Sequence, residues 1–217
     1  MTSQQQRLIA QQDYIDSFKG LTIYGVAGTN GSGKDSLMDF FANRGFLVYN
    51  TSDNLRRIAS AVLNSTARGG NDSPLGRVGN AQRTAYPGGT VDLGLLDWWI
   101  QAGQLPDDLK PRGLVIGSIR GTGEAKRLKE FGGKLIVLDA DIKIRYQRLA
   151  SRRRVDDVGL TFEEFKKHEN GDMAVGQTDP TKFGMAAVIE QADIRIDNTG
   201  DDLAHFHTHI INTLGLT

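Results

Sequence analysis

The sequence contains no cysteine, which excludes disulfide bridges, thiol nucleophiles and cysteine-ligated zinc. It also lacks any apolar run approaching the roughly 18 residues that a membrane-spanning helix needs. Neither sign of charge is in excess, because 26 Lys and Arg residues balance 26 Asp and Glu residues. A protein that binds nucleic acid or anionic lipid non-specifically is expected to be basic. We therefore expect neither nucleic-acid nor membrane partners.

Proline is also scarce, with five residues, whereas glycine is abundant, with 26 residues concentrated in particular loops. A chain of 217 residues with 39% hydrophobic and 24% charged residues can bury a core without disulfides or a structural metal. The first twenty residues show no apolar segment or cleavage site of a secretory signal. These features predict a cytoplasmic protein with a polar lead-in over residues 1–20 and one domain over residues 21–217. The sequence does not specify an oligomeric state.

Short β-prone runs alternate with segments of helical periodicity. The runs expected to form strands are Leu21–Ala27, Phe46–Asn50, Gly113–Gly117, Lys134–Asp139 and Asp193–Asp197. Helices are expected near residues 37–45, 52–65 (with Ser52 as N-cap), 75–86, 91–103, 123–131, from 141, 161–170, 182–191 and after 201. This alternation predicts an α/β fold with a five-stranded parallel sheet covered by helices on both faces. The helical passage between the second and third strands is an insertion at the carboxyl side of the sheet, where such folds bind ligands.

The segment Gly28–Lys34, GTNGSGK, has the G-x-x-x-x-G-K pattern of a phosphate-binding loop. Its glycines allow backbone N–H groups to surround a phosphate, the following helix adds its positive end, and Lys34 adds a mobile cation. A glycine-rich turn can also bind nothing, but the expected strand before it and helix after it favour nucleotide binding. The expected nucleotide-binding residues in this segment are Gly28, Asn30, Gly31, Ser32, Gly33, Lys34, Asp35 and Ser36.

Asp35 stands where such loops usually carry the Ser or Thr whose hydroxyl binds Mg²⁺, and Ser36 supplies a hydroxyl one residue later. This ending resembles the G-K-G-T and G-K-D-T endings of nucleoside monophosphate kinases, in which the metal is held largely through water. The resemblance implies ATP and Mg²⁺ as cofactors. Ser36 is one candidate metal ligand.

Two further segments carry the same resemblance. Thr51–Arg56, TSDNLR, resembles the S-T-G-D-x-L-R segment of adenylate kinases, which implies that Arg56 binds the acceptor phosphate and that Asp53 organises the metal waters. Gly117–Arg120, GSIR, resembles their D-G-I-R segment, which implies that Arg120 also contacts the acceptor. Gly117 replaces the aspartate of that segment, so Asp53 becomes the main candidate to organise Mg²⁺.

The C-terminal half completes the resemblance. The arginine-rich segment 145–157 resembles the lid of these kinases, and the charged helix at 162–170 occupies the matching position. The segment 193–200, DIRIDNTG, resembles the last strand and the turn near the adenine, which includes Asn198. The chain thus resembles the nucleotide kinases related to adenylate kinase and dephospho-CoA kinase over residues 21–212. This implies a three-layer P-loop sandwich with strand order 2-3-1-4-5, an acceptor-binding insertion at 57–110 and an Arg-rich lid at 145–170.

The sequence therefore predicts an ATP-dependent kinase for a small phosphorylated acceptor, chiefly a nucleoside or deoxynucleoside monophosphate. Phosphoryl transfer depends on alignment and charge stabilisation more than on a nucleophilic side chain. The expected catalytic residues are Lys34, Arg148, Arg152, Arg154 and Asp53, and the expected acceptor-binding residues are Asp53, Arg56, Arg83 and Arg120. For any single arginine, a solvated basic face is the alternative.

Two other functions stay open. A kinase resembling dephospho-CoA kinase would transfer to a ribose hydroxyl and would need a general base, for which Asp53 is the candidate. A nucleotide-binding protein with little turnover is the second alternative, and Gly117 in place of the aspartate favours it.

Three features invite a ligand but favour a structural role. His205 and His209 share a helix face that could hold a metal, yet a polar face beside Phe206 and Ile210 is favoured. The pair at residues 98–99, both Trp, could stack on a base, but at least one is expected in the core. Asp139 is expected as a surface strand end.

Overall fold

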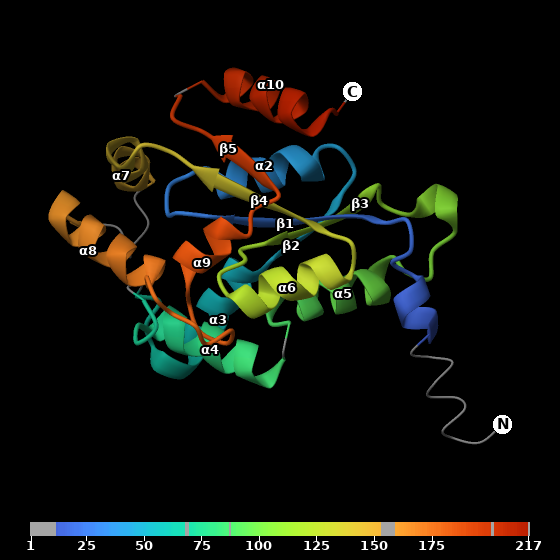
Figure 1. The fold of residues 1–217 in the computed structure, drawn as a ribbon, viewed down its shortest axis with the longest axis horizontal. Coiled ribbons are helices and arrows are strands. Elements are labelled where there is room, and N and C mark those ends of the chain that lie inside the picture. The colour runs from blue at the N-terminus through green and yellow to red at the C-terminus, as the bar shows by residue number, and fades with distance from the viewer. Residues whose placement is uncertain (1–11, 68–69, 87, 153–158, 201, 217) are drawn as a thin grey trace.

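The computed structural model describes residues 12–67, 70–86, 88–152, 159–200 and 202–216 (Figure 1). Within these ranges the strands form one parallel sheet in the order β2-β3-β1-β4-β5. The strands are β1 (Thr22–Gly28), β2 (Leu47–Asn50), β3 (Gly113–Gly117), β4 (Lys134–Asp139) and β5 (Ile194–Asp197). The predicted α/β class, five-stranded sheet and strand order are confirmed.

The helices alternate with these strands along the chain. They are α2 (Lys34–Ala42), α3 (Thr51–Leu63), α4 (Pro74–Ala85), α5 (Thr90–Gln101), α6 (Thr122–Glu130), α7 (Ile142–Ser151), α8 (Phe162–Met173), α9 (Met185–Glu190) and α10 (Leu203–Leu214), with a 3₁₀ turn at Asp107–Leu109. None of the helices in the described ranges has the length and apolarity that crossing a bilayer requires.

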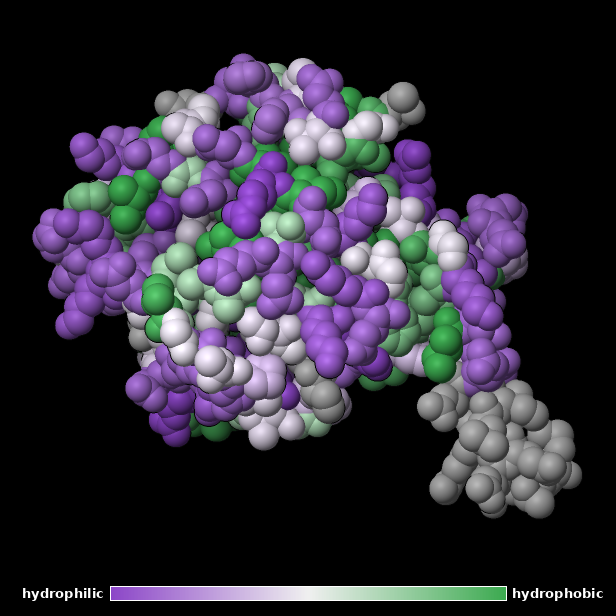
Figure 2. Space-filling view, viewed as in Figure 1, coloured by the Kyte–Doolittle hydropathy of each residue, from purple (hydrophilic) through white to green (hydrophobic). Residues whose placement is uncertain are grey.

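The sheet is the middle of three layers. Helices α2 and α10 cover one face, and α5, α6 and α9 cover the other (Figure 1). Successive residues of β3 enter opposite cores: Leu114 and Ile116 pack on the side of α5, and Val115 packs on the side of α2. This burial on both faces explains why the strands are continuous apolar runs in the sequence. On the molecular face shown in Figure 2, hydrophilic side chains predominate and hydrophobic ones lie in small separate groups.

One predicted helix start is wrong. Ser52 does not cap α3, because the helix begins at Thr51 and Asn50 is its N-cap. The Asn50 side chain accepts a hydrogen bond from Ser52 N at 3.1 Å. Strand β2 runs directly into the helix, so Asn50 keeps the extended backbone that an N-cap requires.

Of the features expected to be structural, the tryptophan pair has such a role. Trp98 is buried in the core, which confirms the structural interpretation of at least one tryptophan. Phe206 and Ile210 are buried, while His205 and His209 are exposed beside them. Among the described residues, no group of three His, Cys, Asp or Glu side chains is arranged to hold a metal.

Candidate active site

Loops that follow the strands meet at the carboxyl edge of the sheet. The phosphate loop Gly28–Lys34 follows β1, Thr51 follows β2, Ser118 follows β3 and Asn198 follows β5. Parallel strands place these segments side by side although they are far apart in the chain. Ser32 and Asn198, for example, are hydrogen-bonded across a separation of 166 residues. The site is therefore built by the fold rather than by any one segment.

The backbone of the phosphate loop requires glycine. Gly28 has φ 145° and Gly33 has φ 100°, and residues that carry a Cβ rarely adopt these positive values. A Cβ at Gly28 would lie 2.2 Å from the backbone oxygen of Leu138, and one at Gly33 would lie 2.3 Å from Nδ2 of Asn198. Glycine at these two positions lets the loop pack closely against Leu138 and Asn198.

The side chains of Lys34 and Asn198 both donate to backbone oxygens of the loop. Lys34 Nζ donates to the backbone oxygens of Gly28 and Thr29 at 2.8 and 2.6 Å, which keeps the ammonium group over the loop. Asn198 Nδ2 donates to Ser32 O at 2.9 Å and so ties the loop to the end of β5. Asp139, the exposed strand end, accepts from Thr29 Oγ1 at 2.8 Å.

Three adjoining pockets pass through this region. The central pocket, about 350 Å³, opens on the phosphate loop and is lined by Lys34 and Asp35 among others. The inner pocket, about 530 Å³, lies toward α3 and α4 and shares Ser52, Arg56, Ser118 and Arg120 with the central pocket. The outer pocket, about 600 Å³, lies toward α7 and α10 and shares Gly33 and Arg152 with the central pocket. The phosphate loop thus lies between two further binding spaces.

The predicted arginines divide between these pockets. Arg56 and Arg120 line both the central and the inner pocket, and Arg83 lines the inner pocket alone. Arg148 and Arg152 line the outer pocket. Arg148 donates to the backbone oxygens of Gly31 and Gly200, and Arg152 lies 3.6 Å from the carboxylate of Asp35. Arg154 lies outside the described residues.

Arg83 is held more by the protein than its predicted role suggests. Its guanidinium donates to Asn80 Oδ1 at 2.7 Å and to Thr181 O at 3.1 Å, and it lies 3.7 Å from the carboxylate of Glu124. Burial lowers the pKa of Arg83, and the nearby Glu124 charge opposes that shift. These partners fix Arg83 as part of the inner pocket wall.

The candidate metal residues lie in different places. Asp53 is 74% exposed, forms a 3.0 Å ion pair with Arg56, and is not among the described residues lining the three pockets. Ser36 lines the outer pocket and Asp35 lines the central pocket. Mg²⁺ is usually bound by one or two carboxylates together with substrate phosphates and water. The carboxylate of Asp35 beside the phosphate loop fits such a water-rich site.

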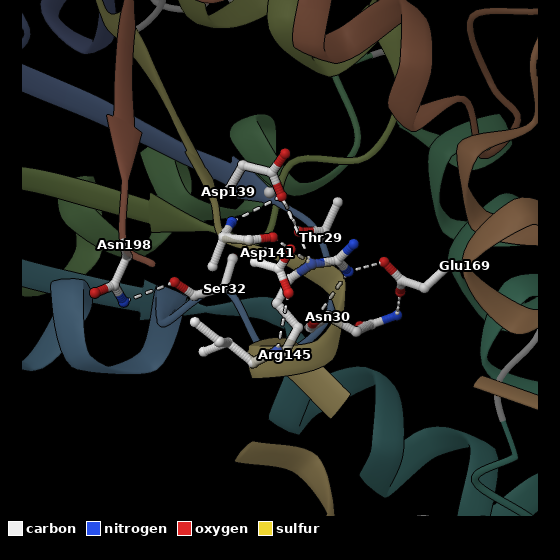
Figure 3. A network of polar contacts seen from close by, with 12 residues as sticks. Thr29, Asn30, Ser32, Asp139, Asp141, Arg145, Glu169 and Asn198 are labelled. Carbon is white, nitrogen blue, oxygen red and sulfur yellow. Dashed lines mark hydrogen bonds and ion pairs between the residues drawn. The ribbon is translucent and has the colours of Figure 1, made fainter. Parts of the chain in front are cut away.

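Two carboxylates at the site were not predicted from the sequence. Glu169 and Asp172 on α8 contact Asn30 of the phosphate loop, and Glu169 pairs with Arg145, an arginine of the expected lid segment. Figure 3 shows Glu169 reaching toward Asn30 and Arg145. Their i, i+3 spacing places Glu169 and Asp172 on one face of α8, but the sequence does not reveal what that face contacts.

Glu124 on α6 is a third unpredicted residue. Its buried carboxylate accepts hydrogen bonds from the backbone N–H groups of Arg120 and Gly121, both at 2.9 Å, and of Thr90 at 3.0 Å. Glu124 therefore fixes the backbone that carries Arg120.

Buried polar atoms without partners gather at the same place. Within the described chain there are four such side-chain atoms, and three are Ser32 Oγ, Thr51 Oγ1 and Arg56 Nε. An unsatisfied buried polar atom costs about 1–3 kcal/mol, so folded proteins keep few of them. Thr51 lines the inner pocket and Arg56 lines both the inner and the central pocket, whereas Ser32 belongs to the phosphate loop.

Comparison with known sequences places the chain in a family. A UPF0200 protein of Pyrobaculum aerophilum is 30% identical over 183 residues, which cover 82% of this chain and 88% of that protein. The chain belongs to the UPF0200 family. A second UPF0200 protein, from Methanoregula boonei, is 26% identical over 183 residues and matches 83% of this chain and 89% of that protein. No family model matches the sequence.

Solved structures show that this UPF0200 protein has a kinase fold. Shikimate kinase from Acinetobacter baumannii superimposes with a TM-score of 0.52 at 14% identity, covering 92% of this chain and 96% of the kinase. TT1252 from Thermus thermophilus superimposes with a TM-score of 0.51 at 16% identity, covering 91% of this chain and 98% of that protein. The expected P-loop kinase fold is confirmed, whereas the nucleoside monophosphate kinase subgroup stays a prediction.

Proposed function

We propose that this UPF0200 protein is an ATP-dependent kinase that transfers the γ-phosphoryl group to a small phosphorylated acceptor, a nucleoside or deoxynucleoside monophosphate. One observation carries the proposal: the central pocket joins the phosphate loop directly to a second pocket, and Arg56 and Arg120 line both. A protein that only binds a nucleotide needs no second pocket with arginines at its junction with the phosphate loop.

The donor nucleotide would lie across the outer and central pockets. Its phosphates would receive hydrogen bonds from the amides of the phosphate loop and from Lys34, at the positive end of α2. Its nucleoside would lie in the outer pocket, where Asn198 and Phe206 form part of the wall. The Lys34 ammonium group would then exchange the carbonyl oxygens of Gly28 and Thr29 for phosphate oxygens.

The acceptor would lie in the inner pocket with its phosphate toward the phosphate loop. Arg56 and Arg120 present guanidinium groups there, which bind phosphate oxygens in pairs. The hydroxyls of Ser52 and Ser118, 3.2 Å apart, lie at the same junction. Leu55, Leu75 and Phe183 provide apolar surface in the same pocket for the remainder of the acceptor.

Transfer would proceed by alignment and charge stabilisation. The acceptor oxygen attacks the γ-phosphorus, the bond to the β–γ bridging oxygen breaks, and ADP leaves with the negative charge. Lys34 and Arg152, which both line the central pocket, would neutralise that charge. Bound Mg²⁺ would add further charge neutralisation at the phosphates, with Asp35, Ser36 and Asp53 as the residues available to orient its waters. Arg148 and Arg154 would act from the lid over residues 145–170.

Transfer to a hydroxyl is the second candidate, and Asp172 favours it. This carboxylate lines the inner pocket, so it could accept the proton that a hydroxyl acceptor must lose. The exposed Asp53, the residue expected for this role, lies outside the pocket lining. A phosphate acceptor needs no such base.

The test is ADP release from Mg·ATP in the presence of ribo- and deoxyribonucleoside monophosphates or dephospho-CoA. We expect one monophosphate to stimulate release, and Lys34→Ala to abolish the stimulation. Lys134→Ala is the matched control, because Lys134 is exposed at the start of β4, the opposite edge of the sheet. Stimulation only by dephospho-CoA would support the hydroxyl acceptor. ATP binding without stimulation by any acceptor would contradict the kinase assignment.

A further inference from the structure

Helix α8 contacts both the phosphate loop and the acceptor arginine through two buried carboxylates. We infer that Glu169 and Asp172 are positioning residues that couple the central pocket to the inner pocket, so that occupancy of one favours binding in the other. The inference rests on the proposed function, because it assigns the two pockets to donor and acceptor.

Asn30 is the point where the contacts meet. Its Nδ2 group donates to Glu169 Oε1 at 2.8 Å and to Asp172 Oδ2 at 2.9 Å. Its Oδ1 accepts from Nη2 of Arg120 at 3.2 Å. Asn30 is only 6% exposed, and it belongs to the phosphate loop. The side-chain amide of one loop residue therefore connects α8 to an arginine of the inner pocket.

Asp172 extends the connection to the acceptor side. Its Oδ2 also accepts from Nη1 of Arg120 at 3.2 Å, and its Oδ1 accepts from the backbone N–H of Gly70 at 3.0 Å. Gly70 lies in the loop before α4, a helix that contributes Leu75 and Gly76 to the inner pocket. A single carboxylate thus contacts the loop before α4, Arg120 and the phosphate loop.

Glu169 extends the connection to the donor side. It forms a buried ion pair with Arg145, whose Nη1 group also donates to Asn30 O at 3.3 Å. Arg145 Nε donates to Ala140 O at 2.9 Å, which anchors the group to the end of β4. Arg145, Glu169 and Asn30 are all buried.

The physical consequence is shared ordering. Phosphate bound by Arg120 would restrain Asp172 and Asn30, and the donor phosphates would restrain the backbone of the same loop. The first ligand restrains the network residues, so the second ligand loses less conformational entropy when it binds. The first ligand therefore raises the affinity for the second, which is positive coupling. Removing the negative charge of Asp172 leaves Arg120 without its carboxylate partner. This change weakens the contacts that connect the central pocket to the inner pocket.

Calorimetry tests the coupling with defined probes. The affinity for Mg·AMP-PNP is measured without and with saturating inorganic phosphate, the anion common to all phosphorylated acceptors. For the wild type we expect phosphate to tighten Mg·AMP-PNP binding by about fivefold or more, the usual lower end of coupling between sites. For Asp172→Asn and Glu169→Gln we expect the ratio to fall toward one.

Control variants separate positioning from stability. Glu163→Gln makes the same chemical change on the exposed face of α8, where Glu163 pairs only with Lys166 at 2.7 Å among the contacts described, and should keep the wild-type ratio. Asn30→Ala removes the connection but keeps both carboxylate–arginine pairs, so it tests the inference if Asp172→Asn does not fold. A purely structural role would lower the melting temperature and leave the ratio unchanged.

The inference and the proposed function fail differently. A wild-type protein without Mg·AMP-PNP binding or acceptor-stimulated ADP release contradicts the proposed function. An active wild type whose coupling ratio is one, or a folded Asp172→Asn or Asn30→Ala variant with the full wild-type ratio, overturns the inference alone. An Asp172→Asn variant that keeps the full coupling ratio but loses turnover with a hydroxyl acceptor also overturns it, and identifies Asp172 as a proton acceptor.

Discussion

The phosphate loop consists of seven consecutive residues, whereas the inner pocket is assembled from segments between Thr51 and Phe183. The loop depends on backbone: glycines with positive φ bring its chain close to β4 and β5. The inner pocket depends on side chains, since Arg83, Arg120 and Asp172 are fixed by partners on other elements. A loop that depends on glycines can be predicted from the sequence, but a pocket that depends on side-chain pairs between distant elements can be described only once the fold is known.

The largest effect is expected from Glu124→Gln, which breaks the support of the inner pocket. The variant leaves the buried Arg83 without its carboxylate and replaces an acceptor of three backbone hydrogen bonds. We expect the free energy of unfolding to fall by about 3–5 kcal/mol, the usual cost of breaking a buried ion pair. Urea denaturation measures it. Glu130→Gln, on the exposed side of α6, should cost under about 1 kcal/mol, and equal losses would contradict the account.

Lys34→Ala removes the cation of the phosphate loop. Removing the ammonium group should lower kcat for acceptor-stimulated ADP release by about 10²–10³, as for other residues that stabilise charge in a transition state. The fold should stay intact, because the loop backbone is set by glycines and by Asn198. Steady-state kinetics and circular dichroism check both statements. A variant with unchanged kcat would remove Lys34 from the mechanism.

Arg120→Lys sharpens the comparison by separating donor from acceptor. The variant keeps the charge but loses the two-pronged geometry, which costs about 1.5–3 kcal/mol of hydrogen bonding to a charged group. We expect KM for the acceptor to rise roughly 10- to 100-fold and KM for ATP to change much less. Arg112→Lys is the control, because Arg112 is exposed and lies just before β3. An equal rise in both KM values would show that Arg120 does not belong to the acceptor side.

Gly33→Ala compares two glycines that both have positive φ. At Gly33 the new Cβ would lie 2.3 Å from Nδ2 of Asn198, while at Gly132 nothing lies within 4 Å. Backbone strain costs about 1–3 kcal/mol in either case, so stability alone separates the two variants weakly. We expect Gly33→Ala to lose ATP affinity in calorimetry and Gly132→Ala to keep it. ATP binding retained by Gly33→Ala would mean that the loop tolerates a side chain.

The smallest effect concerns the sheet that supports both regions. Burial raises the pKa of Tyr24, which packs against Phe41 and Phe46. A raised folded-state pKa means that stability is fully present below about pH 10 and is lost as the pH rises through the folded pKa. Tyr24→Phe should flatten the decline in the free energy of unfolding above pH 10. Urea denaturation at a series of pH values measures this decline. An identical decline in both proteins would exclude Tyr24 as its source.

The sequence predicted much of the fold because the strands are buried on both faces and punctuated by glycine. The phosphate-loop motif and the parallel sheet follow from local patterns, whereas Arg56 and Arg120 were expected from the resemblance to known kinases. Resemblance to known kinases supplied the strand order. It also supplied an expectation for Asp53, which the structure places at the exposed end of an ion pair rather than in a pocket.

The parts that could not be predicted depend on long-range pairing. Asn30 and Glu169 are 139 residues apart, and Arg83 meets a backbone oxygen 98 residues away. Nothing local marks a carboxylate as the partner of a particular arginine. A charged helix such as α8 has the same composition whether its face is solvated or buried.

The most direct test of the central claim is transfer of the label from [γ-³²P]ATP, because it follows the phosphoryl group itself. The account predicts that the label appears on an added monophosphate, and that Lys34→Ala abolishes this transfer. Label released only as inorganic phosphate, at one rate with and without every acceptor, would contradict it and identify a nucleotide hydrolase with an unused inner pocket.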